Sequence, residues 1–120
     1  MSTRTLPRAE WRSYCDRLSK AVAGRRVELD VVSLDLGDRL EARWLPLFGI
    51  VFDSRSDVLE IALEGVGHSV LSPSQIVLEE TERGLVAVEI MSADDTVDLL
   101  RFREPLRLAH GEPTVLGKPT

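Results

Sequence analysis

With 120 residues and a net charge of −5, the chain is long enough for one domain with its own hydrophobic core. The single cysteine, Cys15, excludes an intrachain disulfide. Too few thiolates and imidazoles are present for a closed zinc site, so we expect neither a metal nor a cofactor. No segment approaches the ~20 apolar residues that span a membrane, and the N-terminus has no signal-peptide pattern. We therefore expect a cytoplasmic protein.

Charge is distributed unevenly along the chain. Residues 1–26 hold seven basic and two acidic side chains, whereas residues 27–104 hold six basic and seventeen acidic ones. Internal pairing between a basic helix and an acidic sheet is the simpler interpretation of this pattern. The alternative is a polar surface that associates head to tail with other copies.

The N-terminal segment has the pattern of an amphipathic helix. Pro7 suits a first helical turn, and Thr5 is the better capping residue before it. Gly24 is suited to end the helix. The apolar positions recur with helical spacing and place one stripe on one face: Trp11, Cys15, Leu18 and Val22. Because Cys15 lies in this stripe, we interpret it as a small buried hydrophobe and not as a reactive thiol.

After Gly24 the hydrophobic period changes to two, which is typical of strands. Pro46 lacks a donor, so we expect the chain to bend there or to run along an edge. Gly49 predicts a bulge or a close approach, and residues 48–52 are expected to form the most buried strand. The turns are short, so neighbouring strands should pair antiparallel. The expected strands lie in residues 27–31, 40–44, 48–52, 59–63, the stretch after 67, 76–78, 86–90 and 97–102.

These elements predict an α+β fold: an N-terminal amphipathic helix packed on a twisted, mostly antiparallel sheet or open β barrel of about seven strands. The apolar stripe of the helix should meet side chains from the strands over 47–52 and 59–63. Residues 1–108 are expected to form the single domain. Residues 109–120 contain prolines and glycines without periodicity, and we expect a flexible C-terminal tail there.

Several segments resemble an uncharacterised family of small bacterial proteins, catalogued as a domain of unknown function. They are LPRAEW (6–11), WLPLFGIVFD (44–53), DVLEIALEG (57–65), the stretch from His68 to Pro73, and LLRFREPLRL (99–108). The resemblance covers nearly the whole chain through Leu108 and departs from the family's usual proline and lysine turn at Ser54-Arg55-Ser56. It implies a single-domain bacterial cytoplasmic protein and supplies no activity, cofactor or catalytic residue.

His68 is the best titratable candidate in the chain, because imidazole exchanges a proton near neutral pH. Glu64 precedes it by four residues and is the carboxylate that would orient it in acid–base chemistry. The competing interpretation is a histidine at a strand end, hydrogen-bonded to backbone. No nucleophile or second imidazole with a fixed position accompanies it, which favours this structural interpretation.

The residues that follow two other motifs exclude the phosphate-loop and calcium-loop interpretations. Gly65-Val66-Gly67-His68 is followed by a strand, whereas a phosphate loop opens a helix. Residues 53–57 have the start of a calcium loop but no bidentate glutamate at the required spacing. Acidic strands and few aromatics argue against nucleic-acid binding, so we expect neither a nucleic-acid nor a membrane partner.

We carry three functional hypotheses. The first is a non-catalytic interaction module, most simply a self-associating one, with another protein or a homo-oligomer as partner. The second is a small-molecule-binding β barrel lined by Trp44, Phe48, Phe52 and His68. The third is an acid–base enzyme that uses His68. We name no catalytic residue, since the large side chains are needed for the core.

Overall fold

The structure, a computed structural model, describes residues 1–22, 24–33 and 37–108. A short strand β1 (Ser2–Thr5) precedes a 3-10 turn η1 (Arg8–Glu10) and the helix α1 (Trp11–Val22). Seven further strands follow: β2 (Arg26–Ser33), β3 (Gly37–Asp53), β4 (Val58–Leu63), β5 (Val66–Leu71), β6 (Pro73–Thr81), β7 (Gly84–Ser92) and β8 (Val97–Leu106).

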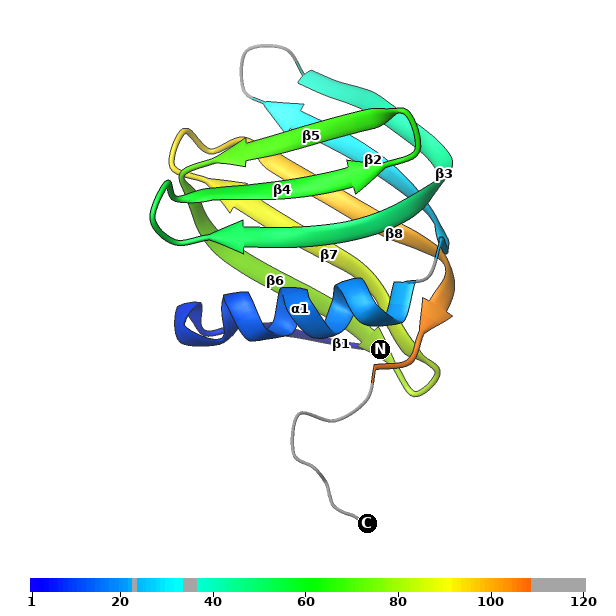
Figure 1. The fold of residues 1–120 in the computed structure, drawn as a ribbon. Helices are drawn as coiled ribbons and strands as arrows, with labels where there is room; N and C mark the ends of the chain where they lie inside the picture. The colour runs from blue at the N-terminus through cyan, green and yellow to red at the C-terminus, as the bar shows by residue number, and fades with distance from the viewer. Residues whose placement is uncertain (23, 34–36, 109–120) are drawn as a thin grey trace.

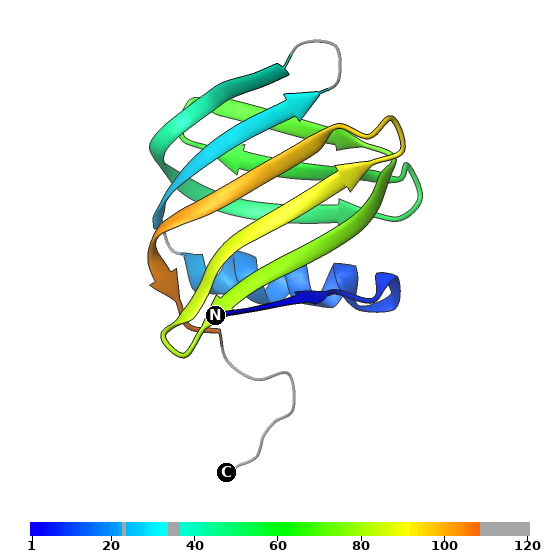
Figure 2. The same cartoon turned by 180° about the vertical axis from the view of Figure 1, so that it is seen from behind.

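The strands form one curled antiparallel sheet in the order β1-β6-β7-β8-β2-β3-β4-β5. In Figure 1, β3, β4 and β5 lie in front of β2, β8, β7 and β6, and Figure 2 shows the latter layer from behind. In this view the helix α1 lies below β3, and β1 and β6 run behind the helix. The antiparallel pairing expected from the short turns is confirmed.

The predicted α+β class is wrong, because the protein is largely all-β. Strands hold about two thirds of the described residues, and α1 has only 12 residues beside a three-residue 3-10 turn. The described residues form eight strands, against about seven expected. The short N-terminal strand was missed, because the sequence STRT has no apolar alternation and pairs with β6, far away in the chain. Thr5 consequently lies in a strand and is not a helix cap.

The helix contributes its apolar stripe to the interior, as its spacing predicted. Its buried residues are Trp11, Tyr14, Cys15, Leu18 and Val22. The indole of Trp11 packs edge to face on Phe52 of β3, with ring centroids 5.1 Å apart. The helix ends at Val22, and Gly24 adopts the left-handed φ of +78° that suits a residue after a helix.

The long strand β3 joins two strands that were predicted separately from the sequence, over residues 40–44 and 48–52. Residues 37–46 pair with β2, and residues 47–53 pair with β4, so β3 passes from one layer to the other. The change occurs beside Pro46, where a bend was expected, and Trp44 there has an unusual positive φ of 54°. Residues 48–52 are not fully buried: Phe48 and Val51 are 58% and 56% exposed, because only one face of this layer meets the core.

The predicted C-terminal tail, residues 109–120, lies outside the described residues. No helix in the described ranges is long and apolar enough to cross a membrane.

Candidate functional site

The four residues predicted to line a ligand site lie in different surroundings. Phe52 is 6% exposed and packs on Trp11 in the core, whereas Phe48 stands on the outer side of the β3–β4–β5 layer. Trp44 is partly buried at the bend of β3. His68 lines a hollow of about 180 Å³, and none of the other three belongs to the lining of that hollow.

At the bend, Trp44 is held by two arginines. Arg26 donates a hydrogen bond of 2.9 Å to the Trp44 carbonyl oxygen, and the guanidinium of Arg103 lies 5.9 Å from the centre of the indole ring. These contacts fix a strained backbone position where β3 changes partners. They support a structural role for Trp44 at this bend.

His68 contacts a buried carboxylate in the opposite layer. Its Nε2 lies 2.6 Å from Oδ1 of Asp98, which joins β5 to β8 across the interior. Asp98 is only 2% exposed, whereas the His68 side chain is 21% exposed. A buried carboxylate is costly unless a donor satisfies it, and the imidazole is that donor.

The surroundings favour the protonated imidazole. The hydrogen bond to Asp98 raises the pKa of His68, burial opposes this, and the negative charges of Asp98, Glu41 and Glu60 add to the rise. With both ring nitrogens protonated, Nε2–H donates to Asp98. The hollow beside the pair is lined by polar and apolar side chains. The polar ones are Ser69, Ser92, Asp94 and Thr96, and the apolar ones are Val31, Val70 and Leu71.

Asp98 was missed as the partner of His68, and Glu64 was named instead. Glu64 is exposed in the turn between β4 and β5, where its amide donates to the carbonyl of Pro46. One signal for Asp98 was present in the sequence. Period two places residues 98, 100 and 102 on the same inward face of β8, so a carboxylate stood at a core position. Its partner depends on how the two layers meet, which spacing along the chain does not give.

The pair is able to bind and release a proton beside a polar hollow, which is the geometric part of acid–base chemistry. Among the described residues, no group of three or more His, Cys, Asp or Glu side chains is placed to hold a metal ion. Cys15 is buried, and burial raises the pKa of its thiol to about 12. That environment agrees with the interpretation of Cys15 as a core residue.

The fold and this pair define a small protein built mainly from antiparallel strands, with an imidazole–carboxylate contact between its two layers. The chain belongs to the family of unknown function DUF5335, which matches residues 2–111. It is also 32% identical over 109 residues to an uncharacterized protein from the bacterium Aquifex aeolicus (strain VF5). That match covers 90% of this chain and 98% of the relative. No solved structure matches the chain. The family expected from the sequence segments is therefore confirmed.

Proposed function

We propose that this protein is a non-catalytic, self-associating interaction module, and that two copies stack through the outer face of β3, β4 and β5. The observation that carries the proposal is the exposure of apolar side chains on this face. Phe48, Val51 and Leu71 are 58%, 56% and 66% exposed, and all three stand on it. In Figure 1 the helix lies below these strands and leaves their outer face uncovered. Exposed apolar groups that gather on one face mark interaction surfaces.

The register of the strands divides this outer face into a bulky end and a flat end. Beside the turn between β3 and β4, Val58 pairs with Leu71, and Val51 lies diagonally next to Val58. At the other end, Ala62 pairs with both Gly49 and Gly67. Phe48 is the extra residue of the bulge between Leu47 and Gly49 and lies at the flat end. Apart from Phe48, the large outward side chains therefore lie at one end of this surface and the small ones at the other.

A twofold axis perpendicular to the strand direction pairs the bulky end of one copy with the flat end of the other. It places β4 antiparallel over β4 of the second copy, so that the bulky end of each copy covers the flat end of the other. Val51 pairs with Glu60 at the middle of the face, so it then lies beside the axis and next to the Phe48 ring of the second copy. Leu71 meets the space above Gly67, where no heavy atom lies within 4 Å of an added Cβ.

The charges in the two turns that flank β4 agree with the same arrangement. Arg55 is exposed in the turn before β4, and Glu64 is exposed in the turn after it. The axis brings Arg55 of each copy to Glu64 of the other. The face spans about six residues by three strands, or roughly 300 Å², which is well below the ~800 Å² per partner of a stable interface. The association is therefore weak and reversible.

Sedimentation velocity over a concentration series tests this proposal with charge reversals. The single changes Arg55→Glu and Glu64→Arg should each weaken the association, and the double change should restore it. Leu71→Ser should also weaken it, whereas Leu40→Ser should not, because Leu40 is 47% exposed but lies on the other part of β3. A monomer at all concentrations, or a double change that associates no more tightly than the single changes, would contradict the proposal.

The hypothesis of a small-molecule-binding barrel has weaker support. Of its four predicted lining residues, Phe52 is used in the core, and the hollow at His68 is small. The buried large side chains form one continuous cluster with those of the helix. A ligand site between the layers would have to displace that packing, at a cost of several kcal/mol.

A further inference from the structure

A separate cleft lies where the helix, the turn between β6 and β7, and the end of β8 meet. It encloses about 290 Å³, and arginines approach it from three elements: Arg4 of β1, Arg17 of α1 and Arg107 after β8. Tyr14 of α1 also lines it. This cleft is distinct from the His68 hollow and from the outer face of β3, β4 and β5, and it shares no lining residue with either.

Two donors in the cleft have no acceptor in the part of the chain that the structure describes. Tyr14 is only 3% exposed, and its hydroxyl has no hydrogen-bond partner among the residues that the structure describes. The buried Nε of Arg17 likewise has none in the same described part of the chain. Native proteins seldom leave a buried donor unpaired, because the lost hydrogen bond is not compensated. Two such donors together point to an acceptor that binds between them.

The Tyr14 hydroxyl keeps its proton at neutral pH. Burial and the charge of Glu80 raise the pKa of Tyr14 to about 12, so its hydroxyl stays neutral and able to donate. The guanidinium of Arg17 lies 5.2 Å from the centre of the Tyr14 ring, which keeps the two groups side by side. Glu80 does not fill the role of acceptor: its Oε1 accepts from Arg4 Nε at 3.0 Å, and it makes no hydrogen bond to the Tyr14 hydroxyl or to Arg17 Nε.

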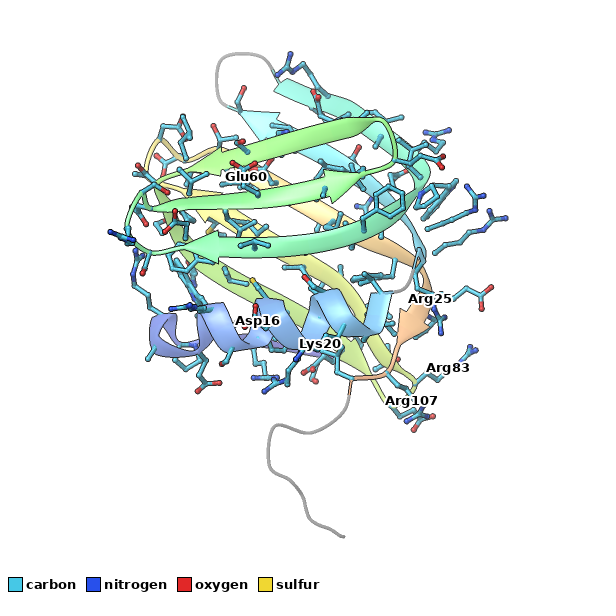
Figure 3. The ribbon with its side chains drawn as sticks, in the orientation of Figure 1. Asp16, Lys20, Arg25, Glu60, Arg83 and Arg107 are labelled. Atoms are coloured by element: carbon cyan, nitrogen blue, oxygen red, sulfur yellow. The ribbon has the colours of Figure 1, made fainter. Side chains whose placement is uncertain are left out.

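A second hollow of about 300 Å³ adjoins this cleft and shares Leu106 and Arg107 with it. Arg25 and Arg83 line it together with Arg107, against one carboxylate, Glu104. Figure 3 shows these three labelled arginines at the same end of the molecule. The described residues give none of the three a salt bridge, although Arg107 Nη2 donates to the carbonyl of Glu82 at 3.4 Å. Clustered positive charge without carboxylate partners attracts anions.

We infer that this cleft binds the oxyanion of a small molecule, a phosphate or a carboxylate, which accepts hydrogen bonds from the Tyr14 hydroxyl and from Arg17 Nε. Arg107 binds the same anion from the rim. A ligand with a second anionic group extends toward Arg25 and Arg83. The two buried donors are reached as the long arginine side chains rearrange around the anion.

Titration of the full chain with inorganic phosphate, followed by amide NMR signals, tests this inference. Sodium acetate and sodium chloride at equal ionic strength form the comparison arms. Phosphate should shift the signals of Tyr14, Arg17 and Arg107 in a saturable way, and chloride should not. A response to acetate equal to that to phosphate identifies a carboxylate as an equally good ligand and also supports the site.

Three variants define the contacts. Tyr14→Phe removes only the hydroxyl and should weaken phosphate binding about tenfold, since hydrogen bonds to charged groups are the stronger ones. Arg17→Gln should weaken it by at least as much. Arg12→Gln is the matched control on the exposed side of the same helix and should change it less than about twofold.

Without phosphate, Tyr14→Phe should unfold at the same temperature as the parent chain or a higher one, because it removes an unpaired buried group and leaves no large cavity. The inference fails if phosphate and chloride give the same shifts. It also fails if Tyr14→Phe binds phosphate as tightly as Arg12→Gln does.

Discussion

The hydroxyl of Ser19 in α1 bonds to both backbone groups of Ile50 in β3. Its Oγ donates to the Ile50 carbonyl oxygen at 2.8 Å and accepts from the Ile50 amide at 2.8 Å. A neighbouring strand would make the same pair of bonds, so one helical side chain stands in for a strand at this edge of β3. This relationship explains how a single helix closes a sheet that is otherwise built from strands.

Ser19→Ala should destabilise the protein by about 1–3 kcal/mol, because both groups of Ile50 lose their partner in a part-buried place. Urea unfolding measures the change. Ser13→Ala is the control, since the Ser13 hydroxyl bonds to the exposed carbonyl of Glu10 and its loss should cost less than about 0.5 kcal/mol. Equal costs for the two serines would contradict the role given to Ser19.

Gly49 permits the close approach of the helix. A Cβ added there would lie 3.2 Å from Ser19 Oγ, so Gly49→Ala should destabilise the protein by about 1–2 kcal/mol. Gly67→Ala adds a methyl group with no heavy atom within 4 Å and serves as the control. The cost of Gly49→Ala should fall when Ser19 is already alanine. Additive costs in this double-mutant cycle would show that the two positions do not interact.

The pair of His68 and Asp98 predicts a pH dependence with a definite sign. The pKa of His68 is raised in the folded state, so its contribution to stability is fully present below the unfolded value of about 6.5. The contribution is lost as pH rises through the folded pKa. The difference in unfolding free energy between the parent chain and His68→Gln should therefore be largest in mild acid and shrink as the pH rises through the raised pKa of His68.

Denaturant unfolding at several pH values measures this difference. Asp98→Asn should flatten the pH dependence in the same way while keeping the size of the side chain. Asp98, Glu41 and Glu60 all raise the pKa of His68, and the hydrogen bond to Asp98 has the largest effect. Neutralising Glu60 alone should therefore change the pH dependence of stability less than Asp98→Asn does. Parallel profiles for the parent chain and His68→Gln would exclude the coupling.

The thiol of Cys15 should react only when the protein unfolds. It is buried in the helix stripe, and burial raises its pKa to about 12, so little thiolate exists at neutral pH. A disulfide reagent at pH ~8 should modify it at the rate of unfolding and at once in concentrated guanidinium. Rapid modification of the native protein would show that the helix does not stay packed.

Glu60 limits the proposed self-association. It stands in the middle of the outer face of β3, β4 and β5, where Figure 3 labels it, and it accepts a hydrogen bond of 2.7 Å from Ser69. The twofold arrangement brings the two Glu60 carboxylates toward each other, and like charges directly opposite are destabilising. Glu60→Gln should therefore strengthen association several-fold in sedimentation. Weaker association of this variant would place the contact elsewhere.

The sequence predicted local structure better than long-range structure. The helix stripe from Trp11 to Val22, the left-handed Gly24 and the close approach at Gly49 follow from spacing and residue type, so each was predictable. The strand at residues 2–5 was not, because its pairing with β6 joins distant segments and leaves no hydrophobic pattern. That omission, and the weight given to one clear helix, produced the wrong α+β class.

The candidate site shows the same limit. His68 was identified from its side-chain chemistry, but its partner was sought four residues away, whereas Asp98 lies thirty residues along the chain. Only the curling of the sheet brings β5 against β8. Likewise, Phe48 and Phe52 are both aromatic and lie close together in the sequence. Phe48 lies in the bulge between Leu47 and Gly49 and is exposed, whereas Phe52 is buried.

The most direct measurement on the proposed module is a search for contacts between two copies by isotope-filtered NMR on a mixture of labelled and unlabelled chains. A cross-peak between the Phe48 ring of one copy and the Val51 methyl groups of the other is expected. On dilution, the amide signals of β4 and β5 should move and those of β6 and β7 should not. Cross-peaks from the β6–β7 layer instead, or none at millimolar concentration, would contradict self-association through the outer face of β3, β4 and β5.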